Sequence, residues 1–180
     1  SAMITERREG VWARLKTMPV SMTSLILGKL TAYVGVCLVQ FFCIAMIGRW
    51  LLPMLGTDAF IVDGRLGAII VVALISALAA AGYGILLGTL TRTNQQAGIV
   101  GPLSVVIAAA LGGIMVPVFA MPPMMQTISL VSPLAWAHEA FMILLVRGGS
   151  LSDTLGRLAL LSLFFLVTFL LALYSFRRKR

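Results

Sequence analysis

The single histidine of the chain, His138, stands directly before a glutamate, Glu139, and this pair is how the zinc-protease motif H-E-x-x-H begins. In that motif a second histidine follows one helical turn later, and both imidazoles bind the metal. Here the corresponding position holds Met142, and the chain has no other histidine. A histidine-based zinc site is therefore not expected.

Other residue patterns that support catalysis are also incomplete. The only Gly-Lys pair, Gly28-Lys29, lacks the upstream glycine of a phosphate-binding loop, and no G-x-S-x-G turn occurs. The stretch RGGS at residues 147–150 is faintly similar to an ATPase signature, but the topology derived below puts it on the outer side, away from ATP. The sequence thus predicts a protein that is not itself an enzyme and that binds no metal or cofactor.

The composition of the chain predicts the kind of structural element that holds these residues. Of the 180 residues, 60% are hydrophobic and 11% are charged, whereas soluble domains keep about 25% charged. The apolar runs are long enough for helices that cross a bilayer, which need about 20 residues, and barrel strands would be shorter and alternating. We expect an all-α integral membrane protein with a single membrane domain over residues 1–180. Its four transmembrane helices are expected at about residues 24–50, 66–91, 98–119 and 155–176.

The distribution of charge predicts the orientation of these spans. With four spans, the side of the N-terminus carries ten basic and two acidic residues, a net charge of +8, whereas the other side carries four of each. Basic residues collect on cytoplasmic loops. Both termini are therefore expected in the cytoplasm, with the chain in the cell (inner) membrane. No nucleic-acid partner is expected, because basic residues next to a span contact anionic lipid headgroups and no aromatic-lined basic surface accompanies them.

The segment before the first span has the pattern of a short amphipathic helix. Val11, Leu15 and Met18 recur at helical spacing, and Pro19 ends the segment. Such a helix lies either on the lipid surface or against another protein at the cytoplasmic face. Its charged residues are Glu6, Arg7, Arg8, Glu9, Arg14 and Lys16.

Prolines break the apolar stretch between the third and fourth spans. Pro117, Pro122 and Pro133 make it too irregular for one helix, although it is as apolar as a span. We expect a broken, re-entrant helical region on the outer side at about residues 120–147, with short helices at 124–130 and 134–146. Irregular backbone at membrane depth must be surrounded by protein or water.

Polar side chains inside apolar segments are candidates for function. His138 and Glu139 lie in the re-entrant region, either at the level of the outer headgroups or as a gate that contacts substrate. Within the spans, polar residues form either interhelical hydrogen bonds or contacts along a pathway. These residues are Gln40, Ser76, Tyr83 and Ser104. The second span also contains the close-packing pair Gly84 and Gly88 in GILLG.

Three motifs in register resemble those of type-2 ABC transporter permeases, the ABC-2 exporter class. ERREGVWARLKTMPVSMTSLILGKL is similar to the charged segment that precedes the third span of that family. LLGTLTRTNQQAGIVGPL looks like its turn between the fourth and fifth spans, and GGIMVPVFAMPPMMQTISLVSPLAWAHEAF resembles its outer re-entrant region. One departure is Val11, where the family usually has threonine.

The resemblance implies a function as the transmembrane subunit of an exporter. Residues 1–20 would hold the coupling helix, whose charged side chains contact a separate ATPase subunit that binds ATP and Mg. The subunit would pair with a second permease subunit, identical or different, and move a drug, lipid, polysaccharide or peptide outward. Relative to the family pattern, two upstream spans are not in this sequence. The alternative is a small multi-span scaffold or assembly protein without transport activity.

Overall fold

The structure, a computed structural model, describes residues 22–56 and 64–178. Over these residues every regular element is helical, and no strand occurs. Four of the helices are long and apolar enough to cross a membrane, as predicted. The predicted amphipathic segment, residues 1–20, lies outside the described residues.

The first span is longer than a bilayer requires. It consists of α3 (Met22–Met46), a π-helical turn η1 (Ile47–Leu51) and the short α4 (Leu52–Met54). The apolar stretch of 29 residues from Ile26 to Met54 is close to the length predicted. A helix this long rises about 1.5 Å per residue, so it tilts or extends into the headgroups.

The second and third spans form a helical hairpin. Helix α5 (Leu66–Leu90) is followed by α6 (Asn94–Leu111), which begins where the Thr93 hydroxyl accepts a hydrogen bond from the Gln96 amide at 3.1 Å. This corrects the predicted third span of 98–119, which starts four residues too late and ends eight residues too late. The helix ends early because Gly113 adopts a φ of +80°, a conformation that terminates helices and that glycine tolerates best.

The predicted broken region is present as two short helices. After a 3-10 turn, η2 (Val118–Ala120), come α7 (Pro123–Ser129) and α8 (Pro133–Leu145), and these two helices meet at 84°. Each begins at a proline, which suits the first helical position because its missing N–H would be unpaired there. The bend is stabilised by the Trp136 indole, whose Nε1 donates to the Leu130 carbonyl at 2.7 Å. The last helix, α9 (Leu151–Arg178), follows directly.

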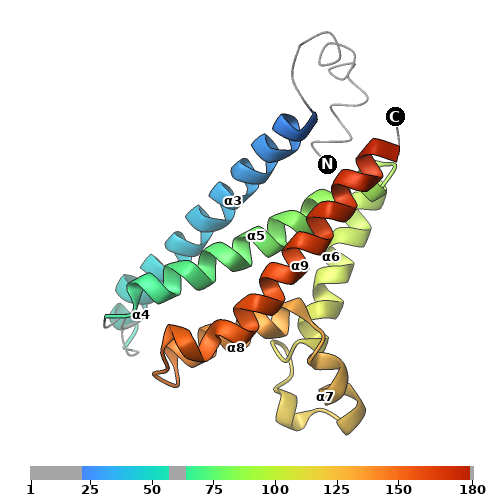
Figure 1. Cartoon of the computed structure of the whole chain (residues 1–180). Helices are drawn as coiled ribbons and strands as arrows, with labels where there is room; N and C mark the ends of the chain where they lie inside the picture. Colours follow the sequence, from blue (N-terminus) through green and yellow to red (C-terminus); the bar gives the residue numbers. More distant parts are fainter. Residues whose placement is uncertain (1–21, 57–63, 179–180) are drawn as a thin grey trace.

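The chain ends of the described helices gather at two sides of the molecule. Figure 1 shows the start of α3, the turn between α5 and α6, and the end of α9 at one end. The opposite end holds α4, α7, α8 and the start of α9. The arrangement is the one expected if four helices cross the membrane and the bent pair of α7 and α8 enters and leaves on the same side. Below, the two ends are called the α5–α6 end and the α8 end.

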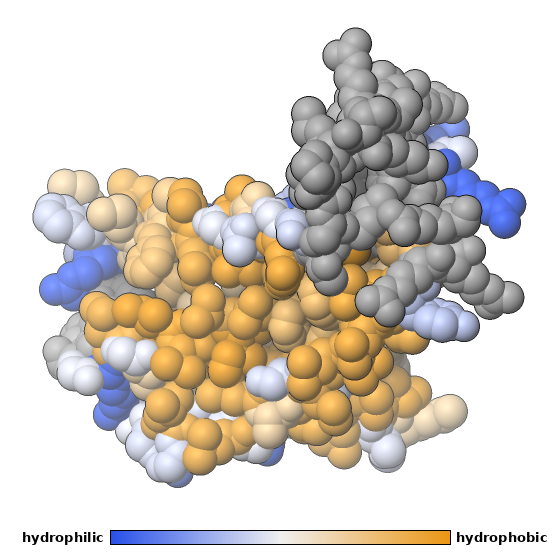
Figure 2. Space-filling model, turned by 45° about the horizontal axis from the view of Figure 1, so that its top comes forward, coloured by the Kyte–Doolittle hydropathy of each residue, from blue (hydrophilic) through white to orange (hydrophobic). Residues whose placement is uncertain are grey.

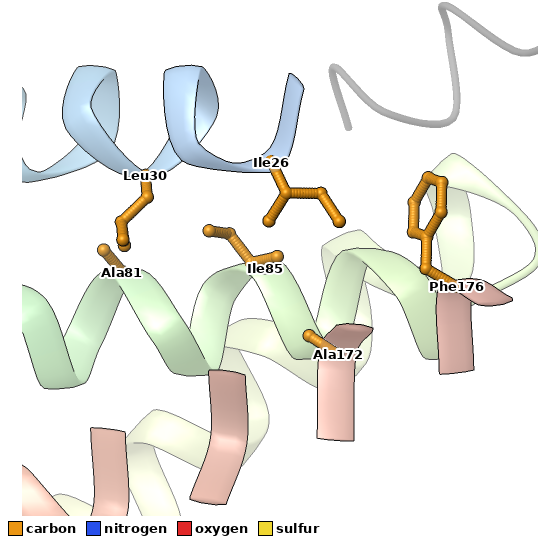
Figure 3. Close-up of a cluster of buried hydrophobic side chains, with 6 residues drawn as sticks. All are labelled: Ile26, Leu30, Ala81, Ile85, Ala172 and Phe176. Atoms are coloured by element: carbon orange, nitrogen blue, oxygen red, sulfur yellow. The ribbon is translucent and has the colours of Figure 1, made fainter. Parts of the chain in front are cut away.

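Helix α5 lies at the centre of the bundle. It packs most extensively against α9 and also contacts α3, α6 and α8. Near the α5–α6 end, six buried apolar side chains from α3, α5 and α9 meet in one cluster (Figure 3). They are Ile26, Leu30, Ala81, Ile85, Ala172 and Phe176.

Close approach of α5 and α9 depends on Gly82. A Cβ at this position would lie 2.8 Å from Cδ2 of Phe165 and 3.0 Å from Oγ1 of Thr168. Gly84, which the GILLG pattern singled out, is instead exposed and has no atom within 4 Å of such a Cβ. The second span therefore does use a small residue for a close helix contact, as predicted. Within this chain that residue is Gly82 and not Gly84.

A second cluster joins α5, α8 and α9 near the α8 end, with Ile69 and Val72 from α5, Ala140 and Leu144 from α8, and Leu158 from α9. Outside these clusters the surface is apolar. Figure 2 shows one face covered by hydrophobic side chains over its middle, with hydrophilic residues toward its margins. Such a surface suits lipid and not water.

Candidate functional site

A hollow lies inside the bundle, bounded by α5, α6, α8 and α9, and we call it the central cavity. Its volume is about 540 Å³, within the range of roughly 300–1,000 Å³ that sites for drug-sized ligands occupy. The lining is mostly apolar, and twelve residues form it. They are Ser76, Ala79, Ala80, Tyr83, Ser104, Val105, Ala108, Pro133, Leu134, Ala137, Leu161 and Phe164.

Three of the four polar residues singled out in the spans meet in this cavity. Ser76 and Tyr83 lie seven residues apart on α5, so that two helical turns bring them to one face. Ser104 lies across the cavity on α6. Gln40, the fourth, lies on the exposed surface of α3 and is not part of the lining.

Ser76 differs in its hydrogen bonding from Ser104 on α6 and Thr168 on α9. Serine and threonine in membrane helices usually donate to a carbonyl three or four residues earlier on the same helix. Ser104 does so to Gly101 at 2.7 Å, and Thr168 does so to Phe164 at 2.8 Å. Among the described residues, the Ser76 hydroxyl oxygen is buried without a hydrogen-bond partner.

Aromatic side chains form one wall of the central cavity. The rings of Tyr83 on α5 and Phe164 on α9 lie 6.2 Å apart between centroids, tilted by 35°. Four alanines from α5, α6 and α8 also line the cavity, and the other apolar lining residues are Val105, Pro133, Leu134 and Leu161. The cavity thus offers flat apolar surfaces with few polar groups.

A smaller hollow of about 330 Å³ adjoins the central cavity, and we call it the side hollow. The two share Ser104, Ala108 and Pro133 as lining residues. The side hollow extends toward α7, where Ile128 and Val131 line it. At its edge the Ser132 hydroxyl donates to the Ala108 carbonyl at 3.0 Å, which joins the re-entrant pair to α6.

The residues predicted to form an outer gate are spread along the re-entrant pair. Pro117 and Pro122 are exposed and precede η2 and α7, whereas Pro133 begins α8 and lines both hollows. His138 and Glu139 are half-buried on α8 and do not line the central cavity. The Glu139 carboxylate forms an ion pair with Arg147, with Oε1 2.5 Å from Nη1.

The sequence did not reveal Ala137, Leu161 and Phe164 as part of the site. Ala137 carries no chemical signal, and Leu161 and Phe164 look like ordinary lipid-facing residues of the last span. The one available sign was spacing, since Ala137 follows Pro133 by four residues and so shares its helix face.

Charged groups and metal ligands do not gather at the cavity. Within the described residues no cluster of histidine, cysteine and acidic side chains could hold a metal ion. The residues predicted to contact an ATPase, Glu6, Arg7, Arg8, Glu9, Arg14 and Lys16, lie outside the part of the chain that the structure describes.

The fold and the apolar surface define the class: a multi-pass helical membrane protein with a bent re-entrant pair and a cavity between its helices. The family model of the ABC-2 type transporter matches residues 1–146, and the chain belongs to this family. The family implies in general an ATPase partner and a dimeric assembly, and its membrane subunits are generally not catalysts themselves.

The chain is also similar to a bacterial permease of known name. The linearmycin resistance permease protein LnrN of Bacillus subtilis is 27% identical over 175 residues, which cover 97% of this chain and 44% of the relative. The chain thus spans less than half of that relative's length. No solved structure matches the chain.

Proposed function

We propose that this chain is the transmembrane part of an ABC exporter that moves a small apolar compound out of the cell. The observation that carries this proposal is the central cavity, because it brings three polar residues of two apolar helices into one hollow between the helices. A scaffold protein has no need for such a space, whereas a transporter requires a place where cargo leaves lipid or water.

Energy for export would come from a separate subunit. The charged segment at residues 6–16 would dock on an ATPase, which binds ATP and Mg, while this chain binds neither. Two such membrane subunits, identical or different, would form the complete pathway in the inner membrane, with both termini in the cytoplasm. The excess of basic residues on the side of the N-terminus supports this orientation.

The cargo is proposed from the cavity and the relative together. The name of the relative records resistance to linearmycin. We therefore propose a toxic small molecule as cargo here, rather than a polysaccharide or a peptide, because the cavity is small and mostly apolar. Pro133, Ser76, Tyr83 and Ser104 would contact it on the way, and His138 and Glu139 would lie near the exit.

The test reverses charge on the segment proposed to contact the ATPase. Arg8→Glu with Arg14→Glu changes the charge of one short helix by four units, and reversed charges across a contact repel. The helix itself should persist, since glutamate and arginine have similar helix propensities. We expect the ATPase to be lost from the purified complex and cargo-stimulated ATP hydrolysis to fall at least tenfold, at equal abundance in the membrane.

Arg177→Glu with Arg178→Glu is the matched control, because it makes the same charge change on the same side of the membrane at the end of α9. It should leave ATPase binding within about twofold of wild type. If both double variants bind the ATPase equally well, residues 6–16 are a lipid-surface helix and the proposed coupling is wrong.

A further inference from the structure

We propose that the central cavity binds an uncharged, drug-sized molecule with an apolar body and one hydrogen-bond acceptor, which receives the hydrogen of the Ser76 hydroxyl. This inference rests on the proposed function, because it names the class of cargo that the exporter would carry. Three properties of the cavity lead to it: the charge of its lining, the state of Ser76 and the shape of its walls.

Charge excludes ionic ligands. None of the twelve lining residues is acidic, basic or a histidine. An ion placed in this cavity would lose its hydration without gaining a counter-charge, which is strongly unfavourable. Only a neutral molecule, or the neutral end of a larger one, enters such a space readily.

Ser76 supplies the polar contact. A buried hydroxyl without a partner is costly, and native helices avoid it by bonding the hydroxyl to their own backbone. Ser76 lines the cavity and its oxygen has no such bond among the described residues. A ligand carbonyl or ether oxygen would accept the free hydrogen and remove this cost.

The walls favour a flat molecule. Tyr83 and Phe164 form an aromatic side, and aromatic rings pack well against other rings in offset or tilted geometry. The lining also includes four alanines, whose small side chains leave room for a ring system. The volume of about 540 Å³ admits a molecule of drug size.

The side hollow adjoins the central cavity on the side of α7. The side hollow shares three lining residues with the central cavity and extends to Ile128 and Val131. Val131 is 72% exposed on a surface that suits lipid. A neutral apolar molecule dissolved in the bilayer could therefore pass along α6 beneath Ser132 without crossing water.

The test measures binding of the neutral fluorophore prodan, which has a naphthalene ring and one carbonyl. The native subunit with its ATPase is placed in lipid nanodiscs, and the signal of empty nanodiscs is subtracted. We expect saturable binding to wild type. Ser76→Ala should weaken it by about three- to tenfold, the effect of one neutral hydrogen bond, and Ser76→Thr should restore it.

Three comparison variants and one altered ligand locate the site. Ala137→Leu narrows the cavity from the α8 side and should reduce prodan affinity at least tenfold. Ser104→Ala should weaken binding less than Ser76→Ala, because the Ser104 hydroxyl already donates to the Gly101 carbonyl. Ser162→Ala, a serine on α9 outside the lining, should leave binding unchanged. A prodan analogue with a carboxylate on its acyl chain should bind at least tenfold more weakly.

The inference is overturned by the absence of saturable prodan binding, by equal binding in Ser76→Ala and wild type, or by a preference for the carboxylated analogue. If the ATPase binds and hydrolyses ATP normally while prodan does not bind, only the cargo class is wrong. If prodan binds as expected but no ATPase associates, the proposed exporter function is wrong and the cavity remains a binding site.

Discussion

At the scale of single residues, the packing of α5 against α9 depends on the absence of one side chain. Gly82 on α5 faces the Phe165 ring and the Thr168 hydroxyl on α9, and these two helices form the most extensive packing in the structure. Small residues matter here because lipid provides no hydrophobic force that pushes helices together, so association depends on close van der Waals contact. Two residues later, Gly84 has open space instead.

This contrast gives a matched pair of substitutions on one helix. Gly82→Ala places a methyl group 2.8 Å from Phe165 and should destabilise the folded subunit by about 1–3 kcal/mol, the usual cost of overpacking. Gly84→Ala adds the same methyl group where nothing lies within 4 Å and should be neutral or stabilising by up to about 1 kcal/mol. Thermal unfolding in detergent measures both. Equal stability of the two variants would contradict the assigned contact.

At the scale of elements, the re-entrant pair is shaped by a few hydrogen bonds that cross its bend. The Trp136 indole on α8 donates to the Leu130 carbonyl at the end of α7, and the Ser132 hydroxyl between them donates to α6. Gly112 lies against the same junction, where a Cβ would come within 3.1 Å of the Ala135 nitrogen. These contacts position Pro133, which lines both hollows.

Removing the hydrogen bond from the Trp136 indole to the Leu130 carbonyl should loosen α7 without unfolding the bundle. Trp136→Phe keeps an aromatic ring but loses the donor to Leu130, which costs about 0.5–1.5 kcal/mol. We expect faster backbone hydrogen exchange over residues 123–131. Trp50→Phe, at a residue that is 73% exposed in η1, is the control and should leave that exchange unchanged. Unaltered exchange in Trp136→Phe would show that the bend does not depend on this bond.

At the scale of the whole molecule, four crossings and one returning pair place the described loops at two ends. The α5–α6 end carries Lys29 and Arg92, whereas the α8 end carries acidic and basic side chains together, among them Glu139 paired with Arg147. Basic residues are retained on the cytoplasmic side. The α8 end is therefore expected to face outward.

Two exposed residues at equivalent helix positions test this orientation. Ser152 is the second residue of α9 at the α8 end, and Gln95 is the second residue of α6 at the α5–α6 end. With Cys37 and Cys43 replaced by alanine, Ser152→Cys should react with a membrane-impermeant thiol reagent on intact cells. Gln95→Cys should react only after the cells are opened. Labelling of Gln95→Cys on intact cells would reverse the orientation or change the number of spans.

The sequence by itself determined the helical class, the presence of the spans and the broken pair between the last two. These features depend on local properties: the length of an apolar run, the backbone hydrogen bonds that lipid requires, and prolines such as Pro122 and Pro133 that end helices. Even so, the end of α6 was predicted eight residues too late, because the apolar run continues past Gly113, whose positive φ ends the helix.

Only the tertiary structure decided which residues share a site. Ser76, Tyr83 and Gln40 carry the same kind of sequence signal. The packing of α5 against α6, α8 and α9 brings the first two into the lining of the central cavity and leaves Gln40 on the surface. The unpaired hydroxyl of Ser76 could not be predicted, since it depends on side-chain geometry within the folded bundle. The sequence also could not show that Gly82 and not Gly84 makes the close contact with α9. Glycines lie on several faces of α5, and the position of the neighbouring helix decides which of them is in contact.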